Sequence, residues 1–463
     1  QIGRGDRVML VLKRHYEYWF AAVALHKLGA VMIPATHMLT VDDFVYRINA
    51  SGVKAIVCTA QDDVPSTIKQ ALRKSEKNPR LWCVQKDVEG FFNLTSQMET
   101  AGDAFDRVET SAADPMMLYF TSGTTGYPKG VIHDFTYPLA HIVTAKYWQQ
   151  AQDDGLHFTV AETGWAKASW GKIYGQWLIG SAVMIYDFDN FDPKQLVTVI
   201  NRYGVTSFCA PPTVYRYLVR KGIESMPTLK HASTAGEMLA PEVFRKFTQE
   251  TGIPLCEGYG QTETTLLMAN FKGRQPKEGA MGTVSPFYNI ELRDKDGKQV
   301  PDGQIGEVVI IPPAGGKQAG VFTGYLDNEE QYKYVWRGGV YHTGDAAYRD
   351  RDGLYWFHGR FDDIIKTGGF RVGPYEIENV LMEHPAVVEC SVIGVPDKLR
   401  GQAIKAVIVP GHGYEPTREL ELAIKEFCNR RLAEYKWVRL VEFVSAMPKT
   451  ISGKIKKTEL RKG

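Results

Sequence analysis

Five short runs of apolar and β-branched residues constrain the fold of this chain more than any other feature of its sequence. The runs are RVMLVL (7–12), AVMIPA (30–35), KAIVCT (54–59), AVMIYD (182–187) and VTSFCA (205–210). Strands that are apolar on both faces are typical of a parallel sheet that helices cover on both sides. The stretches between these runs have a helical period and would supply the crossovers. We therefore predict an α/β fold with parallel sheets and flanking helices.

A small β-rich piece of different texture is predicted at residues 282–311. Its alternating runs are separated by Asp296-Gly297 and Asp302-Gly303. Asp-Gly pairs are typical of tight turns between antiparallel strands. We expect this piece to belong to the large N-terminal domain.

A second, smaller unit is predicted after residue 360. Apolar runs at 387–395 and 403–409 indicate two strands, and the period of residues 417–434 indicates an amphipathic helix. The apolar face of this helix is formed by Leu420, Ile424 and Phe427. The mixture of strands and helix predicts a small α+β domain.

The boundary between the two units is placed at residues 359–363. We expect an N-terminal domain of residues 1–360 and a mobile C-terminal domain of residues 361–463. About 100 residues are enough for an independent domain. No Gly/Ser-rich linker marks the boundary, so a short hinge should join the domains.

Length and charge limit the classes of protein to which the chain can belong. Its 463 residues are too many for one ordinary core and predict two or three domains. Lys plus Arg number 55 against 53 Asp plus Glu, a net charge of +2. This balance gives no electrostatic reason to expect nucleic acid or an anionic membrane as the main partner. No apolar run is long enough to span a membrane, since His26 and Lys27 interrupt the best candidate at 20–35.

The cysteines and the first residue bear on the compartment. The six cysteines are scattered and none form a CxxC pair, a pattern that suits a reducing compartment. We therefore expect a cytoplasmic protein. The chain begins with Gln1 rather than Met, so we also expect that upstream sequence is missing, together with any targeting peptide in it.

The segment YFTSGTTGYPKG, residues 119–130, predicts a site for a polyphosphate. It directly follows a strand-like run, so that its backbone N–H groups can converge at a strand end. The hydroxyls of Thr121, Ser122 and Thr124 and the ammonium of Lys129 would converge with them. Nests of backbone N–H groups beside a lysine bind phosphate oxygens. The alternative is an ordinary surface turn rich in Gly and Thr.

The spacing within this segment excludes a Walker-type kinase or ATPase. That loop requires G-x-x-x-x-G-K-[ST]. Here Gly126 is followed by Tyr127, and Lys129 by Gly130.

The same segment resembles the phosphate loop of the adenylate-forming (AMP-binding) superfamily, which contains acyl-CoA synthetases, peptide-synthetase adenylation domains and luciferases. The other motifs of that family follow in the family's order. They are TAGEML (234–239), EGYGQTE (257–263), GTVSP (282–286), YHTGD (341–345), GRFDDIIKTGGFRVGPYEIE (359–378) and PKTISGKI (448–455). The resemblance covers almost the whole chain, lacks the family's first segment, and is closest to the short/medium-chain acyl-CoA synthetase subgroup.

The resemblance implies an AMP-forming acid–thiol ligase with two half-reactions. A carboxylate and ATP would give acyl-AMP and pyrophosphate, and the thiol of CoA would then displace AMP. The first step brings together two anions, so the site must supply positive charge and hydrogen-bond donors. The implied partners are ATP with Mg²⁺, a carboxylic acid and CoA.

The family's nucleotide and catalytic residues can be matched one by one to this sequence. ATP and AMP would be bound by Thr121, Ser122, Gly123, Thr124, Thr125, Gly126, Lys129, Gly236, Glu237, Glu257, Gly258, Tyr259, Gly260, Gln261, Asp345, Arg360 and Arg371. Thr262 would bind the α-phosphate, and Glu263 would bind Mg²⁺, which needs only one or two protein carboxylates. Lys454 would bridge the carboxylate and the α-phosphate.

More specific roles follow for some of these residues. Asp345 and Arg360 are matched to the ribose, and Tyr259 would stack on the base. The alternatives are a turn aspartate after Gly344 and, for Lys454, a solvated basic tail.

The small domain is expected to work in both half-reactions. Asp362 matches the family's hinge position, where a backbone rotation would replace Lys454 with KTGGF (366–370) at the site. CoA would then be bound by Gly368, Gly369, Phe370, Arg400 and Arg439. The two glycines would let the pantetheine arm pass close to the backbone.

The acyl pocket is matched to Trp165, Lys167 and Gly260. In acetate-selective relatives a tryptophan occupies the position of Gly260 and closes the tunnel, so glycine predicts a longer channel. Lys167 and Lys172 lie in the pocket-lining segment 161–180, where they could point into the pocket or face solvent. We predict a short- to medium-chain acid, from butyrate-like to octanoate-like, with weaker activity on acetate.

Three other hypotheses remain open. The chain could be an acetate–CoA ligase, or a stand-alone adenylation enzyme that loads a carrier-protein thiol. A non-catalytic nucleotide-binding protein would be expected to have lost Lys454, Glu263 or Asp345, and all three are present. The sequence leaves the oligomeric state open, with a homodimer as one option.

Overall fold

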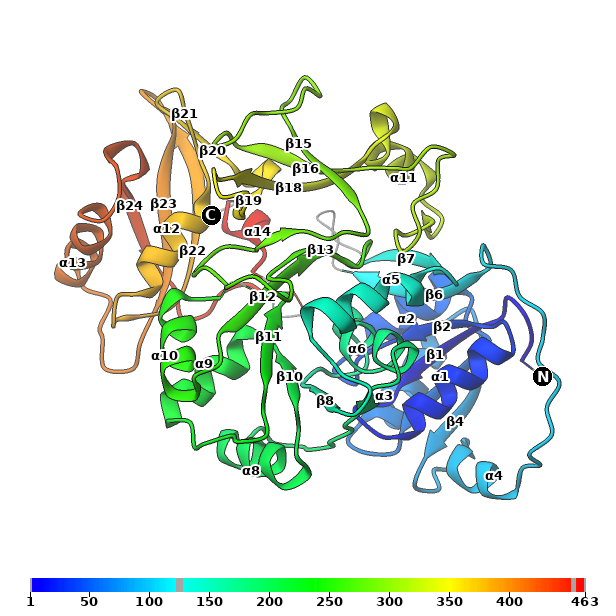
Figure 1. Cartoon of the computed structure of the whole chain (residues 1–463). Coiled ribbons are helices and arrows are strands. Elements are labelled where there is room, and N and C mark those ends of the chain that lie inside the picture. Colours follow the sequence, from blue (N-terminus) through cyan, green and yellow to red (C-terminus); the bar gives the residue numbers. More distant parts are fainter. Residues whose placement is uncertain (1, 122–127, 238, 451–454, 462–463) are drawn as a thin grey trace.

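The structure is a computed structural model and describes residues 2–121, 128–237, 239–450 and 455–461 (Figure 1). The side chains of Asp362 and Arg371 are also outside the described part. Several predicted site residues therefore lie outside the described residues: Ser122, Gly123, Thr124, Thr125, Gly126 and Lys454.

The first large sheet contains the first three predicted strands. Its order is β17-β7-β6-β2-β1-β3-β4-β5. The bounds are β1 Arg7–Val11, β2 Val31–Pro34, β3 Ala55–Thr59, β4 Arg80–Val84, β5 Phe92–Asn93, β6 Pro115–Thr121, β7 Lys129–Asp134 and β17 Gly324–Tyr325. Strands β6, β2, β1, β3, β4 and β5 pair in parallel, whereas β7 and β17 are antiparallel to their neighbours.

Helices cover this sheet on both faces, as the apolar runs predict. They are α1 (Glu17–Lys27), α2 (Val41–Ser51), α3 (Val64–Lys74) and, at the edge, α4 (Leu94–Thr100). Alternate residues of β1 belong to different cores: Leu10 packs in one cluster with Trp19 of α1, and Met9 in another with Phe44 of α2. Burial on both faces explains why the run at 7–12 lacks polar alternation.

The second large sheet has the order β14-β13-β12-β11-β10-β8-β9. Its strands are β8 Leu156–Thr159, β9 Ala182–Val183, β10 Ser207–Ala210, β11 His231–Ala235, β12 Leu255–Gly260, β13 Leu266–Ala269 and β14 Thr283–Val284. The associated helices are α5 Tyr137–Val143 with a π-turn at Thr144–Trp148, α6 Ala166–Gly171, α7 Tyr174–Leu178, α8 Pro193–Tyr203, α9 Pro212–Lys221 and α10 Pro241–Thr251. The centre of the sheet is parallel, and β13 and β14 extend it as antiparallel strands.

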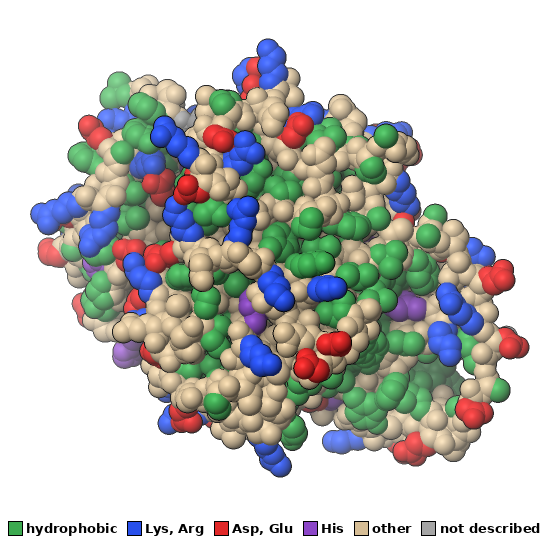
Figure 2. Space-filling view, viewed as in Figure 1, with side chains coloured by type: hydrophobic (Ala, Val, Ile, Leu, Met, Phe, Trp, Pro, Cys, Tyr) green, Lys and Arg blue, Asp and Glu red, His purple; other side chains and the backbone are tan. Residues whose placement is uncertain are grey.

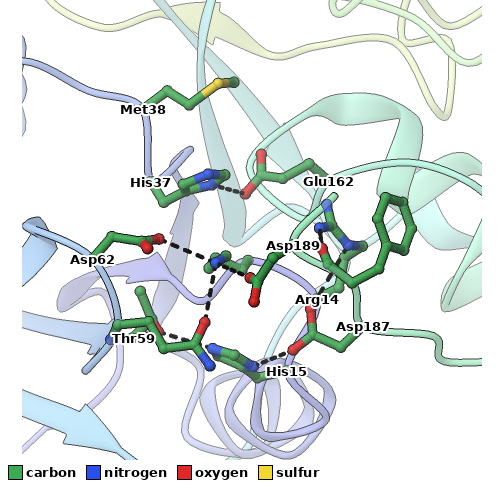
Figure 3. A network of polar contacts seen from close by, with 12 residues as sticks. Arg14, His15, His37, Met38, Thr59, Asp62, Glu162, Asp187 and Asp189 are labelled. Atoms are coloured by element: carbon green, nitrogen blue, oxygen red, sulfur yellow. Dashed lines mark hydrogen bonds and ion pairs between the residues drawn. The ribbon is translucent and has the colours of Figure 1, made fainter. Parts of the chain in front are cut away.

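The predicted strand at 182–187 is wrong beyond its first two residues, because β9 ends at Val183. The residues that follow contact the loop after β1 instead (Figure 3). His15 Nδ1 lies 2.6 Å from the carboxylate of Asp187, and Asp189 lies 2.9 Å from Lys13 Nζ. Lys13 also pairs with Asp62 at 3.1 Å. This polar network joins the two large sheets at the ends of their strands.

An antiparallel sheet of order β15-β16-β18-β19 confirms the predicted β-rich piece. Its strands are β15 Asn289–Arg293, β16 Gly306–Ile311, β18 Tyr341–Arg349 and β19 Tyr355–Arg360. A short helix, α11 (Glu329–Val335), precedes β18. Gly297 and Gly303 adopt φ angles of 78° and 82°, which accounts for glycine at both predicted turns.

The C-terminal unit is built on a sheet of order β21-β20-β23-β22, with β24 paired to β23. Its elements are β20 Ile365–Thr367, β21 Phe370–Val372, α12 Pro374–Met382, β22 Val387–Asp397, β23 Gly401–Pro410, α13 Arg418–Asn429, β24 Leu440–Phe443 and α14 Lys457–Leu460. The chain changes from one sheet to another between β19 and β20, which supports the boundary that we propose at residues 360 and 361.

Helix α13 is shorter than predicted. Asn429 ends it by accepting from Val438 N at 2.8 Å and donating to Val438 O at 3.2 Å, which turns the chain back toward β24. Its buried face includes Ile424, as predicted, and also Cys428. Leu420 and Phe427 are only partly buried.

The charged side chains on the surface agree with the balanced charge of the sequence. Figure 2 shows Lys and Arg side chains interspersed with Asp and Glu over one face of the molecule. Across the described ranges, no helix has both the length and the apolar character needed to cross a bilayer. All six cysteines are free and buried.

One glycine tests how closely the two large sheets approach each other. A Cβ on Gly164, just before α6, would lie 2.3 Å from Thr36 N and 2.5 Å from Ala35 C, at the end of β2. We expect Gly164→Ala to lower the free energy of unfolding by at least about 2 kcal/mol, since backbone cannot move aside as a side chain can. Denaturant titration measures this, with Gly102→Ala as control because a Cβ there meets no atom within 4 Å. Equal stability of the two variants would contradict the packing described.

Candidate active site

Side chains from the second sheet and from the antiparallel sheet meet at the carboxylate of Asp345. Tyr259 Oη donates to Oδ2 at 2.6 Å, and Gln261 Nε2 donates to the same oxygen at 2.5 Å. Arg360 Nη1 donates to Oδ1 at 2.9 Å. Asp345 is 5% exposed, so a buried charge is balanced by charge-assisted hydrogen bonds. Four of the predicted nucleotide residues are thus brought together.

Gln261 is itself held in one orientation. Its Oε1 accepts from Tyr341 Oη at 2.9 Å, and its Nε2 also donates to Thr343 O at 2.9 Å. Arg360 Nη1 donates to the same carbonyl at 3.0 Å. The cluster therefore fixes the position of the Asp345 carboxylate before any ligand arrives.

Thr262 and Glu263 lie in the loop between β12 and β13, and the first sheet holds them. His133 Nε2 donates to Thr262 O at 2.7 Å, and Phe322 N donates to Glu263 O at 2.8 Å. Burial lowers the pKa of His133 to about 4, so the imidazole is neutral and its proton is on Nε2. Tyr325 Oη donates to Glu263 Oε1 at 3.0 Å.

Sequence reasoning missed both His133 and Tyr325. The signal for His133 is a histidine that directly follows the apolar pair Val131-Ile132 in strand β7. Tyr325 has no comparable signal, because β17 contains only two residues and its partner strand is far away in the sequence.

Lys129 begins β7 at the edge of this cluster. It pairs with Thr121 across the β6–β7 hairpin, so the predicted phosphate segment connects these two strands. Burial lowers the pKa of the half-buried Lys129 ammonium, while the carboxylate of Glu263 opposes this shift and Arg360 adds to it. Residues 122–127 themselves lie outside the described part of the chain.

The predicted adenine residues follow β11 and line β12. Thr213 Oγ1 donates to Glu237 Oε2 at 2.6 Å, and Gly236 adopts a φ of 96°. Gly258 must be a glycine, since a Cβ there would lie 2.6 Å from the Trp148 ring. Burial raises the pKa of the Glu257 carboxyl to about 8.

The structure corrects the inference drawn from Gly260. A Cβ at this position would lie 2.3 Å from Thr265 O and 2.5 Å from Trp170 Cη2. Glycine is therefore required by packing, and it does not by itself indicate a long channel. The indole of Trp170, from α6, occupies the space that a side chain at position 260 would enter.

Neither lysine of the predicted pocket segment behaves as a solvent-facing residue. Lys167 Nζ donates to Ala235 O at 2.6 Å, on the side of the second sheet. Lys172 is fully buried, and burial lowers its pKa to about 7, with a further lowering by Arg14. Lys172 therefore lies toward the network between the sheets, whereas Lys167 lies beside the adenine residues. Trp165 is the residue before α6, and its role in the pocket stays a prediction.

The predicted CoA residues gather on the C-terminal unit around one surface pocket. Its lining consists of Thr367, Gly368, Phe370, Arg400, Glu434, Tyr435, Trp437 and Arg439. The rings of Phe370 and Tyr435 stack with centroids 4.5 Å apart and planes 18° apart. Gly368 and Gly369 adopt φ angles of 55° and 82° at the β20–β21 turn. Tyr435 and Trp437 were not predicted from the sequence.

The side chains around Glu263 and Asp345 can bind a polyphosphate nucleotide together with one divalent cation. Within the described ranges, no three His, Cys, Asp or Glu side chains are grouped closely enough to hold a metal ion on their own. A single carboxylate such as that of Glu263 suits Mg²⁺, which takes its remaining ligands from phosphate oxygens and water. The ammonium of Lys129 and the guanidinium of Arg360 supply positive charge nearby.

Comparisons with known proteins identify what the chain is similar to. Residues 1–326 match the family described as AMP-binding enzyme, and residues 376–454 match the AMP-binding enzyme C-terminal domain. The human protein Acyl-coenzyme A synthetase ACSM3, mitochondrial, is 39% identical over 466 residues, which cover 99% of this chain and 79% of the relative. The human protein Acyl-coenzyme A synthetase ACSM4, mitochondrial, is 37% identical over 465 residues, 99% of this chain and 80% of the relative.

Two solved structures show the same fold. The anthranilate CoA ligase AuaEII in complex with anthranoyl-AMP superposes with a TM-score of 0.88 at 27% identity, over 100% of this chain and 88% of that chain. A benzoate CoA ligase from Burkholderia xenovorans LB400 superposes with a TM-score of 0.85 at 25% identity, over 99% and 90%.

The relatives also correct the expected location. We predicted a cytoplasmic protein, whereas these relatives are named as mitochondrial. Scattered cysteines indicate a reducing compartment without saying which one, so the prediction was more specific than its basis.

The buried carboxyl of Glu257 predicts a pH dependence of stability. Its pKa rises from the usual 4.5 to about 8, so the folded protein keeps a proton that the unfolded chain releases between these pH values. The free energy of unfolding should therefore fall as pH rises through this window, and Glu257→Gln should remove the effect. Between pH 6 and 8 the variant should gain about 2 kcal/mol relative to the natural protein, measured by denaturant titration. An unchanged difference across these pH values would contradict burial of an ionisable carboxyl here.

Proposed function

The chain belongs to the AMP-binding enzyme family and is an ATP-dependent acyl-CoA synthetase, and we propose that its substrates are short- to medium-chain carboxylic acids. ATP-dependent activation of an acid is supported most by the convergence of Lys129, Glu263 and Asp345 from three sheets on one site. We also propose a mitochondrial location, following the relatives' names.

In the first half-reaction, a carboxylate oxygen of the acid attacks the α-phosphorus of ATP. The bond from that phosphorus to the bridging oxygen breaks, and pyrophosphate leaves with the electron pair. Negative charge accumulates on the α-phosphate oxygens during this step. We assign the Thr262 hydroxyl and the ammonium groups of Lys129 and Lys454 to these oxygens, and the fixed carboxylate of Asp345 to the ribose hydroxyls.

Mg²⁺ would be held by Glu263 together with phosphate oxygens, where it neutralises charge on the phosphates. The residues present fit this role, because Glu263 Oε1 is tied to Tyr325 and the carboxylate faces the same cluster as Lys129.

In the second half-reaction, the sulfur of CoA attacks the acyl carbonyl carbon of acyl-AMP. The bond from that carbon to the AMP oxygen breaks, the thiol loses its proton, and AMP leaves. The pocket around Gly368, Phe370, Arg400 and Arg439 is the proposed CoA surface. Arginines there suit the phosphates of CoA, and the paired rings of Phe370 and Tyr435 offer a flat apolar surface.

Lys454 is assigned to the first half-reaction and the glycine turn at 368–369 to the second, and both belong to the small domain. The small domain therefore needs two orientations, each of which brings one of them to the site. Asp362 is proposed as the hinge. In the described orientation, the small domain touches the large one near the adenine residues. The ring centroid of Tyr375, from α12, lies 5.2 Å from that of Phe357. Burial raises the pKa of Tyr375, and the carboxylate of Glu257 raises it further.

The two remaining enzymatic alternatives make different demands on the chain. An acetate–CoA ligase needs a closed pocket close to the carboxylate. An enzyme that loads a carrier-protein thiol needs no cations for CoA phosphates, whereas Arg400 and Arg439 line one pocket here. A comparison of CoA with a phosphopantetheinylated carrier protein as acyl acceptor separates a CoA ligase from an enzyme that loads a carrier protein. Assembly into a homodimer remains a prediction.

We expect Trp170 to form the end wall of the acyl pocket. Acids from acetate to decanoate, compared by pyrophosphate release, should show a maximum between butyrate and octanoate. Trp170→Ala should raise the ratio of kcat/KM for decanoate to that for butyrate by about 10-fold, which two further buried methylenes at ~0.8 kcal/mol each would give. Trp177→Ala is the matched control, since that indole is 44% exposed on α7. A sharp acetate maximum in the natural protein, or an unchanged profile in Trp170→Ala, would refute this pocket.

The alternating use of the small domain predicts opposite effects at its two faces. Lys454→Ala should abolish formation of acyl-AMP and largely spare thioester formation from supplied acyl-AMP. Gly369→Trp should block thioester formation and largely spare adenylation, because a bulky side chain would obstruct the pantetheine arm. Rapid-quench assays of each half-reaction measure both effects. Equal loss of both half-reactions in Lys454→Ala would contradict the two-orientation mechanism.

A further inference from the structure

We propose that Tyr325 is a positioning residue that fixes the metal-binding carboxylate of Glu263. This inference rests on the proposed function, in which Glu263 binds Mg²⁺ together with ATP. Tyr325 does not touch substrate in this account. It acts by restricting which carboxylate oxygen faces the phosphates.

Strand β17 holds Tyr325 rigidly. Gly324 and Tyr325 pair with Ile132 and Val131 of β7, and the flanking Thr323 and Leu326 donate their backbone N–H groups to the same strand at 2.7 Å. Tyr325 is 8% exposed. Its ring packs on that of Phe322 with centroids 4.7 Å apart. A two-residue strand with these contacts can keep one side chain in a fixed direction.

The hydroxyl of Tyr325 then determines the geometry of Glu263. It donates to Oε1 at 3.0 Å, while Phe322 N holds the main-chain carbonyl of Glu263 at 2.8 Å. Residue 263 is therefore fixed at both its backbone and its side chain. With Oε1 engaged, Oε2 is the oxygen that can bind a metal ion. Groups that orient a metal-binding carboxylate typically change metal affinity or activity 10- to 100-fold when removed.

The ring of Tyr325 also keeps Lys129 close to this carboxylate without neutralising it. Lys129 Nζ lies 5.5 Å from the ring centroid, within the range of a cation–π contact. Among the described residues, Lys129 and Glu263 form no ion pair with each other. The two charges are near enough to act on one polyphosphate and are still separate. Tyr325 contacts both side chains.

The test compares Tyr325→Phe with Tyr332→Phe in the full chain. Phenylalanine at 325 keeps the ring and loses the hydrogen bond. Tyr332 is the matched control, since its ring also packs on Phe322, at 5.3 Å, from α11. Isothermal titration without acid measures ATP binding with and without Mg²⁺, and electron paramagnetic resonance follows Mn²⁺ binding to the ATP complex. We expect a loss of about 10-fold or more in metal-dependent affinity for Tyr325→Phe, little change in metal-free ATP binding, and no change for Tyr332→Phe.

Each outcome decides between specific claims. Equal weakening of ATP binding with and without the metal, or unchanged Mn²⁺ binding in Tyr325→Phe, would overturn the positioning role. Natural protein that binds ATP without any dependence on the metal would instead overturn the assignment of Glu263 in the proposed function. Rescue of Tyr325→Phe at high Mg²⁺ would support positioning, because a misfolded site would not recover.

Discussion

A short polar dipeptide, Thr262-Glu263, must offer a hydroxyl and a carboxylate to the most negatively charged part of the reaction without being neutralised by its own neighbours. The structure meets this constraint by fixing the backbone of the dipeptide and by placing a neutral hydroxyl, that of Tyr325, against the Glu263 carboxylate. Thr262 O accepts from a neutral histidine, and Glu263 O accepts from Phe322 N. Both donors belong to or adjoin the first sheet, whereas the dipeptide extends from the second (Figure 1). The site therefore exists only while the two large sheets keep their positions relative to each other.

Several contacts far from the reacting groups hold the two large sheets in these positions. The network of Lys13, His15, Asp187 and Asp189 joins the strand ends of the two sheets (Figure 3). Gly164 allows the segment before α6 to touch the backbone at the end of β2. The antiparallel sheet then adds Asp345 and Arg360, and the cluster around Asp345 is complete before a nucleotide arrives. Preorganised charge of this kind is the largest single contribution to many enzymatic rate enhancements.

The sequence predicted the general fold, and four of the residues that it proposes for the nucleotide meet at Asp345. It failed where tertiary contacts override local pattern. The run at 7–12 is a strand because both its faces are buried, which composition alone shows. The run at 182–187 is also apolar at its start, but its strand ends at Val183, and Asp187 and Asp189 contact the loop after β1 instead. Gly260 could be read only as a missing side chain, since the indole that requires the glycine comes from residue 170. Tyr325 was not found because its partner is 62 residues away in the sequence.

The site joins the oxygen of a carboxylate to the α-phosphorus of ATP before CoA takes part. The most direct test supplies hexanoate labelled with ¹⁸O in its carboxylate, together with MgATP and CoA, and examines the products by mass spectrometry. We expect one ¹⁸O atom in the phosphate of AMP and none in pyrophosphate, because the bond that later breaks lies between the acyl carbon and that oxygen. Unlabelled AMP, or label in pyrophosphate or inorganic phosphate, would show that the acid is activated in another way.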